Sequence, residues 1–355
     1  MISDQQKSLQ LIQMLRGVAS ILVVLLHISV NSQEILGYPF LGNVFLFGGS
    51  GVDIFFVLSG FIITYSNFKY IAKPAGIGKF LKRRFVRIFP IYWIIITVFL
   101  MLQLALPAFY KTHFDTGIGN LLQTYLLLPG HIMLNGVSWS LTNELFFYLL
   151  FTLALVIPNK KYSLYLLIGY FIFLLFYSIF VPAIPDGNQF VGMLIFPMNI
   201  EFLFGVLIVI IVNKVPKNWV YPLLITGILL FLTGAFLSIN EIKVTGNNSN
   251  QALSRVLLFG FPSFIIILSV VKLELNRAVK MHNIFLQLGD ASYSIYLIHL
   301  PIVAAFFKIL AKFEIKSNLI LFVLSCLLVI AVCIAGVIIY HKIEKPLIKK
   351  LNGLL

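Results

Sequence analysis

The stretch that decides the fold is Leu9–Val30, LQLIQMLRGVASILVVLLHISV, in which some twenty predominantly apolar residues follow one another. An α-helix needs about 20 such residues to cross the hydrocarbon core of a bilayer. The stretch carries Arg16 and His27, and no small-residue cleavage pattern follows it, which argues against a removable signal peptide. It therefore predicts a membrane-spanning helix that holds two ionisable side chains.

The composition of the whole chain supports this prediction. The chain has 355 residues, of which 60% are hydrophobic and 11% are charged, and its mean hydropathy is +1.01. Soluble domains carry about 25% charged residues. The two cysteines, Cys326 and Cys333, predict neither a disulfide framework nor a thiol metal site, and no metal is expected. The chain is thus predicted to be an integral membrane protein.

Nine further apolar runs are long enough to span a membrane. The predicted fold class is all-α, a polytopic transmembrane bundle of about ten spans, with residues 1–355 forming a single transmembrane domain without a fused soluble domain. The predicted spans are Leu9–Val30, Phe47–Tyr65, Ile88–Leu106, Val137–Ile157, Tyr162–Phe180, Val191–Val212, Val220–Ile239, Ala252–Val271, Ile284–Leu310 and Leu319–Tyr340.

The positions of the basic residues predict the orientation of the bundle. The formal net charge is +14, which on its own would also suit a nucleic-acid-binding protein. With the amino terminus in the cytoplasm, however, 20 of the 26 Lys and Arg residues lie on the cytoplasmic side. This asymmetry follows the positive-inside rule. It predicts a multi-pass protein of the plasma (inner) membrane, with both termini cytoplasmic and no nucleic-acid partner.

Arg16 and His27 mark the two ends of one helix face. They are 11 residues apart, which is about 16 Å along a helix and close to three full turns. Arg16 is then expected near the cytoplasmic boundary and His27 near the external one. Ionisable groups at bilayer depth usually have a function. The alternative for Arg16 is that it only extends its head group to the membrane surface.

Two carboxylates are predicted at the depth of His27. Asp53 opens the second span and Glu144 lies at the start of the fourth, and both spans begin on the external side. A carboxylate beside an imidazole can hold the tautomer that leaves the other ring nitrogen free as a base. His27, oriented by Asp53 or Glu144, is therefore predicted to take a proton from a hydroxyl group. The alternative is that both acids only favour helix amino termini.

Five cations, Lys79, Lys82, Arg83, Arg84 and Arg87, precede the third predicted span. Guanidinium groups match phosphate oxygens, so the cluster can bind a phosphorylated ligand. Such clusters also contact anionic headgroups of membrane lipids and set topology. Both interpretations stay open.

A late apolar run contains an unusually polar stretch, Gly289–His299, in which Tyr293, Tyr296 and His299 occur. Tyr296 and His299 are three residues apart and share a helix face. Glu201 lies deep in the sixth span and needs a partner. Polar groups of this kind also serve as interhelical hydrogen bonds, so their role stays open.

Seven motifs follow one another along the chain. They are LRGVASILVVLLH (15–27), GVDIFFVLSGFII (51–63), KRRFVRIFPIYW (82–93), SWSLTNELFFY (138–148), EFLFGVL (201–207), LGDASYSIYLIHLP (288–301) and EKP (344–346). Together, and in this order, they resemble the acyltransferase-3 family of membrane O-acyltransferases. The resemblance covers residues 15 to 346, nearly the whole chain.

The resemblance implies a donor, an acceptor and a set of residues. The donor is cytoplasmic acyl-CoA, most commonly acetyl-CoA, and the acceptor is a hydroxyl of a cell-surface polysaccharide or lipid-linked glycan. Carried onto this sequence, the catalytic positions are His27, Asp53, Ser140, Glu144 and Tyr293, and the donor-binding positions are Arg16, Lys82, Arg83, Arg84, Arg87 and Trp139. The late tyrosine and histidine of the family correspond to Tyr293 and His299, and the resemblance gives His299 no role. The family often has two successive acids in the fourth-span motif, whereas Asn143 precedes Glu144 here, so a full acid pair is absent.

The predicted function is O-acetyl transfer through a single transmembrane acyltransferase domain. Charged CoA phosphates would stay on the arginines while the neutral acyl arm reaches His27, because phosphate in hydrocarbon is too costly. Ser140 or Tyr293 would donate a hydrogen bond to the thioester oxygen. Direct transfer and an acyl-enzyme are both compatible. The alternative function is a transporter or flippase of a lipid-linked glycan, which also places charges inside a bundle.

Overall fold

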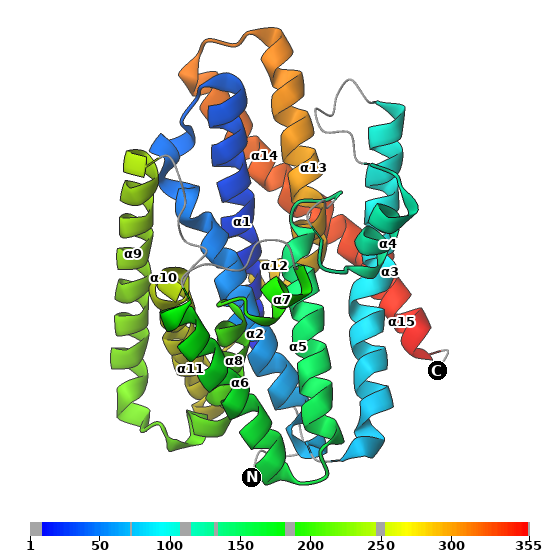
Figure 1. The fold of residues 1–355 in the computed structure, drawn as a ribbon. Coiled ribbons are helices and arrows are strands. Elements are labelled where there is room, and N and C mark those ends of the chain that lie inside the picture. The colour runs from blue at the N-terminus through cyan, green and yellow to red at the C-terminus, as the bar shows by residue number, and fades with distance from the viewer. Residues whose placement is uncertain are drawn as a thin grey trace.

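The long helices of the protein run side by side along one direction (Figure 1). The computed structural model describes residues 9–71, 73–106, 115–130, 134–181, 189–245 and 253–353. Lys7, Lys111 and Ala252, which enter the predictions of charge and span, lie outside the described residues. No strand occurs within the described ranges, so the all-α prediction is confirmed there.

Ten helical segments of the described chain are long and apolar enough to span a membrane, as predicted. The helices are α1 (Gln10–Leu36), α2 (Gly51–Asn67), α3 (Ile77–Ala105), α4 (Ile118–Leu126), α5 (Ser138–Val156), α6 (Lys160–Phe180), α7 (Gln189–Leu194), α8 (Asn199–Ile211), α9 (Val220–Thr245), α10 (Leu253–Arg255), α11 (Phe261–Asn276), α12 (Asn283–Asp290), α13 (Ser292–Leu310), α14 (Asn318–Ile339) and α15 (Lys345–Gly353). Short 3₁₀ segments join them at Phe40–Ser50 (η1), Phe68–Tyr70 (η2), Pro74–Gly76 (η3), Val212–Lys214 (η5), Lys217–Trp219 (η6) and Ala311–Phe313 (η8), and π-helical turns occupy Val256–Gly260 (η7) and Tyr340–Glu344 (η9).

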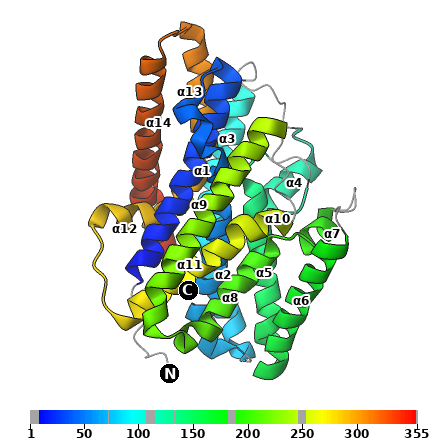
Figure 2. The same ribbon diagram turned by 90° about the vertical axis from the view of Figure 1, so that its left-hand side faces the viewer.

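Two of the predicted boundaries are wrong. The third helix begins at Ile77 instead of Ile88, so the five cations lie on α3 itself and not before it. The predicted ninth span Ile284–Leu310 is two helices, α12 and α13, and α12 lies across the direction of its neighbours (Figure 2). The break has a physical cause: Gly289 sits against the backbone of Gln13, and the Gln13 amide donates a hydrogen bond to Asp290.

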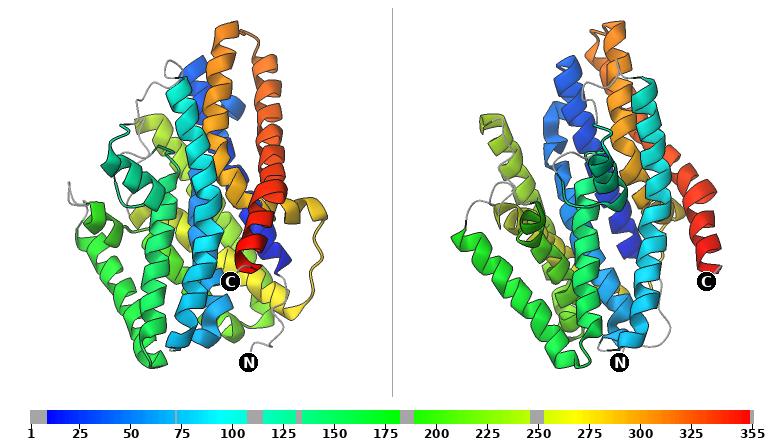
Figure 3. Two further views of the ribbon diagram at one scale, coloured as in Figure 1. Left: turned by 90° about the vertical axis from the view of Figure 1, so that its right-hand side faces the viewer. Right: turned by 45° about the vertical axis from the view of Figure 1, so that its right-hand side comes forward.

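The helices divide into a buried set and a peripheral set. Within its most apolar window, the span that contains α8 is 72% buried by the rest of the protein, whereas the span of α6 is only 17% buried. The exposed residues of α6 are largely Ile, Phe and Tyr, as expected for a surface that faces lipid. Figures 1 and 3 show α3 beside α5 along much of the molecule. Both sets contribute side chains to the cavities described below.

The closest helix contact lies between α2 and α8, where two glycines face each other. A Cβ atom on Gly60 would lie 2.0 Å from the carbonyl oxygen of Phe202, and one on Gly205 would lie 2.3 Å from the backbone nitrogen of Phe61. Small residues let membrane helices approach until their backbones touch. Buried aromatic rings flank the contact, with Phe56 and Phe202 stacked at a centroid distance of 4.4 Å.

The Gly60→Ala variant should be markedly less stable than the wild type. Overpacking a close-packed interior costs about 1–3 kcal/mol, and here the added atom meets rigid backbone. The measurement is the unfolding temperature of the detergent-purified protein. Gly169→Ala is the matched control, because a Cβ there meets nothing within 4 Å on lipid-facing α6. Equal unfolding temperatures for the two variants would contradict the packing argument.

Candidate active site

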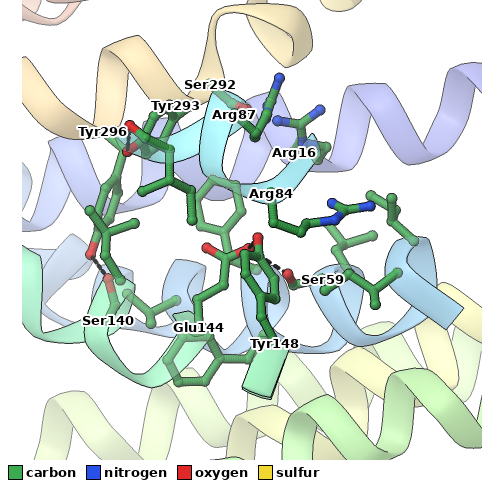
Figure 4. Close-up of a pocket in the computed structure, with 18 residues that line it drawn as sticks. Arg16, Ser59, Arg84, Arg87, Ser140, Glu144, Tyr148, Ser292, Tyr293 and Tyr296 are labelled. Carbon is green, nitrogen blue, oxygen red and sulfur yellow. Dashed lines mark hydrogen bonds between the residues drawn. The ribbon is translucent and has the colours of Figure 1, made fainter. Parts of the chain in front are cut away.

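A cavity of about 320 Å³ lies between α1, α2, α3, α5 and α13, and it is called the central cavity below. Arg16, Ser59, Arg84, Glu144 and Tyr296 are among the residues that line it. Figure 4 shows three arginines at one side of this cavity, Ser140 and Tyr296 at the other, and Glu144 between them. Most of the remaining wall is apolar. The cavity therefore combines a cationic side and a hydroxyl-bearing side within one bundle.

Glu144 is held by hydroxyl groups that sequence reasoning missed. Its Oε1 accepts hydrogen bonds from Ser59 at 2.6 Å and from Tyr148 at 2.5 Å. Arg84 also lies over the ring of Tyr148, at 5.6 Å from the centroid. Ser59 and Tyr148 lie within the motifs 51–63 and 138–148, but their role becomes visible only when α2 meets α5. Glu144 thus contributes negative charge to the arginine side of the cavity.

Arg16 and Arg87 complete this side. Arg16 lines the cavity and donates a hydrogen bond to Gln13 at 3.2 Å, so its guanidinium is directed into the bundle and not only toward the membrane surface. Arg87 lies 3.7 Å from the buried carboxylate of Glu344, which also accepts a 2.6 Å hydrogen bond from Ser294. Glu344, the acid of the EKP motif, therefore fixes Arg87 at the cavity wall.

At the opposite side, Ser140 and Tyr296 form a pair of hydroxyl groups 2.7 Å apart. Both also lie within hydrogen-bond distance of the carbonyl oxygen of Val137, at 3.0 and 3.1 Å. The hydroxyl of Tyr293, a predicted hydrogen-bond donor to the thioester, donates instead to the carbonyl of Ile88 at 3.1 Å. Tyr293 still lines the cavity, but Ser140 and Tyr296 hold the hydroxyls at its end.

Asp53 does not orient His27, contrary to the prediction. Its fully buried carboxylate forms a two-pronged ion pair with Arg255, with Nη2–Oδ2 at 2.7 Å and Nε–Oδ1 at 3.1 Å. Arg255 also donates to the carbonyl of Gly49 at 2.8 Å. The physical reason is that a buried carboxylate requires a full counter-charge, which a neutral imidazole does not supply. In the sequence analysis, Arg255 is one of the six basic residues that the positive-inside rule leaves on the external side, with no indication of a partner.

Glu201 lies beside this ion pair. It is fully buried, packs against Gly260 of the π-helical turn and interacts electrostatically with both Asp53 and Arg255. Its carboxylate oxygens accept no hydrogen bond from the described residues. Asp53 and Arg255 are thus the charged neighbours of Glu201, and no hydrogen bond from the described residues supplies the partner that its position in the span calls for.

His27 lies next to a second histidine. The ring centroids of His27 and His299 are 5.0 Å apart and the rings are tilted by 37°. His27 is half-buried, whereas His299 is completely buried. Neither Asp53 nor Glu144 is hydrogen-bonded to His27, so the predicted cluster of these three groups is wrong. Tyr296 lines the central cavity and its ring is 5.7 Å from that of His299, whereas neither histidine lines the cavity.

A second cavity, of about 950 Å³, is called the basic cavity. It is formed by the end of α2 with η2, and by α3, α6 and α8, and none of the described residues that line it is acidic. Arg84 lines both cavities, whereas the predicted donor-binding residue Lys82 lines neither. Trp139 also lies outside both and packs edge-on against Phe56 and Phe196. The cations of the basic cavity are Lys69, Lys79, Arg83, Arg84 and Lys160.

Metal ligation finds no support within the described ranges of the chain. No group of three or more His, Cys, Asp or Glu side chains there has the arrangement to hold an ion. The chemistry of the site is instead that of imidazoles, hydroxyl groups, carboxylates and guanidinium groups.

Comparison with known proteins gives the family of the chain. A family model described as "acyltransferase domain" matches residues 10–339. The exopolysaccharide production protein ExoZ of Rhizobium meliloti (strain 1021) is 26% identical over 321 residues, which cover 87% of this chain and 92% of that protein. An uncharacterized protein of Haemophilus influenzae is 27% identical over 224 residues, 59% of this chain and 84% of that protein. No solved structure matches the chain significantly.

The family match extends from the first helix to the end of α14 and so includes every residue that lines the two cavities and both members of the histidine pair, whereas Glu344 lies just beyond it. The chain therefore belongs to the acyltransferase-3 family and is a multi-pass membrane acyltransferase.

Proposed function

We propose that this protein transfers an acyl group, which we take to be acetyl, from cytoplasmic acyl-CoA to a hydroxyl of a cell-surface polysaccharide or its lipid-linked precursor. The observation that carries the proposal is that Arg84 lines both the basic cavity and the central cavity. A long donor molecule with a charged end and a neutral end fits two such adjoining spaces. The printed name of ExoZ supports a polysaccharide as acceptor.

The basic cavity would hold the phosphates of CoA. Five cations from three separate segments line it, and they meet no acidic residue among the described lining residues. Arginine forks bind phosphate oxygens through two parallel hydrogen bonds, and lysines add point charges. Arg83 and Arg84 are accordingly the main phosphate ligands, with Lys69, Lys79 and Lys160 around them.

The central cavity would hold the thioester. Its volume is at the lower end of the range of small-ligand pockets, about 300–1,000 Å³, which suits a narrow arm and a small acyl group. Ser140 and Tyr296 would provide a hydrogen bond to the thioester oxygen as negative charge develops there. One of the two hydroxyls then exchanges its bond to the Val137 carbonyl for a bond to the substrate.

His27 would act as the base that takes the proton of the acceptor hydroxyl. Tyr296 lines the central cavity and contacts His299, so the acyl carbon would lie at this end of the cavity, next to the histidine pair. Half-burial leaves His27 accessible to an acceptor that arrives from outside the cavity. Donor and acceptor thus approach the same point from different directions.

The orientation of the bundle belongs to the same proposal. The excess of basic residues on one side supports a plasma (inner) membrane protein whose termini lie in the cytoplasm. Lys69, Lys79, Arg83 and Lys160 are all on the side that this rule assigns to the cytoplasm, where acyl-CoA is present. The basic cavity then opens toward the donor.

The Arg83→Gln/Arg84→Gln double variant should bind CoA at least tenfold more weakly. Hydrogen bonds to charged groups contribute about 1.5–3 kcal/mol each, and 1.4 kcal/mol corresponds to tenfold in affinity. The measurement is the dissociation constant of CoA for the purified protein in detergent. Lys82→Gln, a neighbouring charge removal outside both cavities, should change it little. If Lys82→Gln weakened CoA binding as much as the double variant does, the phosphates would not lie in the basic cavity.

The His27→Ala variant should abolish transfer while the protein remains in the membrane, because a positioned general base contributes about 10²–10⁴-fold to rate. Labelled acetyl-CoA is supplied to inverted membrane vesicles and the label is followed into the glycan as an ester. His341→Ala, an exposed histidine against Tyr340, is the control for loss of an imidazole.

Label in the glycan with the wild type and with His341→Ala, but not with His27→Ala, supports the enzyme. Deletion of the gene should lower the mass of the surface glycan by one acetyl group per repeat. An unchanged glycan mass in the deletion strain would contradict the proposed acyl transfer. Movement of unmodified lipid-linked glycan across the membrane would instead indicate a flippase.

A further inference from the structure

His299 is the one histidine of the described chain whose ring is completely buried, and it contacts His27 directly. The two rings come from α1 and α13, which pack against each other over much of their length. A fully buried imidazole is costly unless its polar atoms are used. The question is therefore what the two nitrogens of His299 do.

The first nitrogen fixes the tautomer of the ring. Nδ1 of His299 lies 2.7 Å from the carbonyl oxygen of Tyr296. A carbonyl oxygen only accepts hydrogen bonds, so Nδ1 must carry the proton. In a neutral imidazole the other nitrogen, Nε2, is then a lone-pair acceptor. The backbone of α13 thus determines that Nε2 is the nitrogen of His299 that can accept a proton or a hydrogen bond.

The second nitrogen is unused in this structure. Nε2 of His299 is buried and has no hydrogen-bond partner among the described residues. The ring next to it is that of His27, at a centroid distance of 5.0 Å. Two imidazole rings joined by a hydrogen bond of ordinary length have their centroids about this far apart, so the separation is compatible with a bond from His27 to Nε2. The unused acceptor and the half-buried imidazole are therefore placed for each other.

Three carboxylates of the candidate site are engaged by groups other than His27. Asp53 is paired with Arg255, Glu144 is bound by Ser59 and Tyr148, and Glu344 by Ser294 with Arg87 nearby. His27 itself has no side-chain hydrogen bond to any of these acids. For His27 to act as a base through one ring nitrogen, another group must accept the N–H of its second ring nitrogen. Nε2 of His299 is a hydrogen-bond acceptor on a ring that contacts His27.

We infer that His299 is the positioning residue for His27, so that a histidine pair replaces the usual histidine–carboxylate pair. This inference rests on the proposed acyl transfer. Nε2 of His299 accepts the N–H of His27, which leaves the other nitrogen of His27 free as base and stabilises the imidazolium when that nitrogen is protonated.

The reaction balances around this pair. The acceptor hydroxyl gives its proton to the free nitrogen of His27 while its oxygen forms a bond to the acyl carbon. The carbon–sulfur bond of the thioester breaks, and the departing thiolate takes the proton from the imidazolium to leave as free CoA. His299 keeps its own Nδ1 proton on the Tyr296 carbonyl throughout. A neutral partner suits this depth, because no second buried charge has to be balanced in the resting protein.

Two nearly isosteric variants separate positioning from packing. His299→Asn keeps a donor to the Tyr296 carbonyl and loses the acceptor at Nε2, whereas His299→Gln places an amide oxygen near the position of Nε2. The Asn variant should lower the turnover number at least about 100-fold with an unchanged KM for the donor, and the Gln variant should stay within about tenfold of the wild type. Unfolding temperatures of both variants show whether the fold is kept.

A spectroscopic measurement tests the same inference without any substrate. In protein labelled with ¹⁵N-histidine, the nitrogen shifts distinguish protonated from lone-pair nitrogens, and His27→Ala and His299→Gln assign the two rings. The expected result is a protonated Nδ1 and an unprotonated Nε2 on His299, and a changed spectrum of His27 in the Asn variant.

A proton on Nε2 of His299, or equal turnover in folded Asn and Gln variants, would overturn the inference. If the wild type transfers no label at all, the proposed function fails while the nitrogen shifts still report on the histidine pair. The two failures are therefore distinguishable.

Discussion

The arrangement of the bundle depends on one constraint, that a charge buried among apolar helices must find its partner inside the protein. Water is absent from the bilayer core, and removing one partner of a buried pair typically costs about 3–5 kcal/mol. The pairs Asp53–Arg255 and Glu344–Arg87 join elements far apart in the sequence. The two ion pairs therefore hold α2 against α10, and α3 against the π-helical turn η9 that follows α14. This structural role is independent of any chemistry at the site.

The same constraint separates two regions of the site. Guanidinium groups gather at the arginine side of the central cavity and in the basic cavity, where a phosphorylated ligand can balance them. The histidine pair lies next to Tyr296, at the hydroxyl-bearing side of the site. The guanidinium groups and the imidazoles thus occupy different parts of the site. This separation suits a donor whose charge stays at one end while its neutral group reacts at the other.

The sequence was a good guide to the fold and a partial guide to the site. Ten apolar runs predicted ten spans because the hydrocarbon core imposes a minimum length that any sequence must show. The break at Asp290 was not visible, since it depends on a contact with Gln13 some 277 residues away. Likewise, Arg255 looked like an external charge, and its pairing with Asp53 needed the packing of α2 against the turn before α11. Residues such as Arg16 and Glu144 were found because charge in an apolar run is conspicuous by itself. Ser59 and Tyr148 were missed because hydroxyls there are common.

The π-helical turn Val256–Gly260 directly follows Arg255. A π turn contains one residue more than an α turn, so it shifts the angular phase of everything before it relative to α11. Gly260, in the last position of this turn, also leaves the space into which Glu201 fits. Deletion of any one residue from the turn would restore a regular helix and carry Arg255 around the axis by roughly a quarter of a revolution. Relatives that keep the arginine are consequently expected to keep the length of this segment, so gaps in an alignment should avoid it even where the side chains vary.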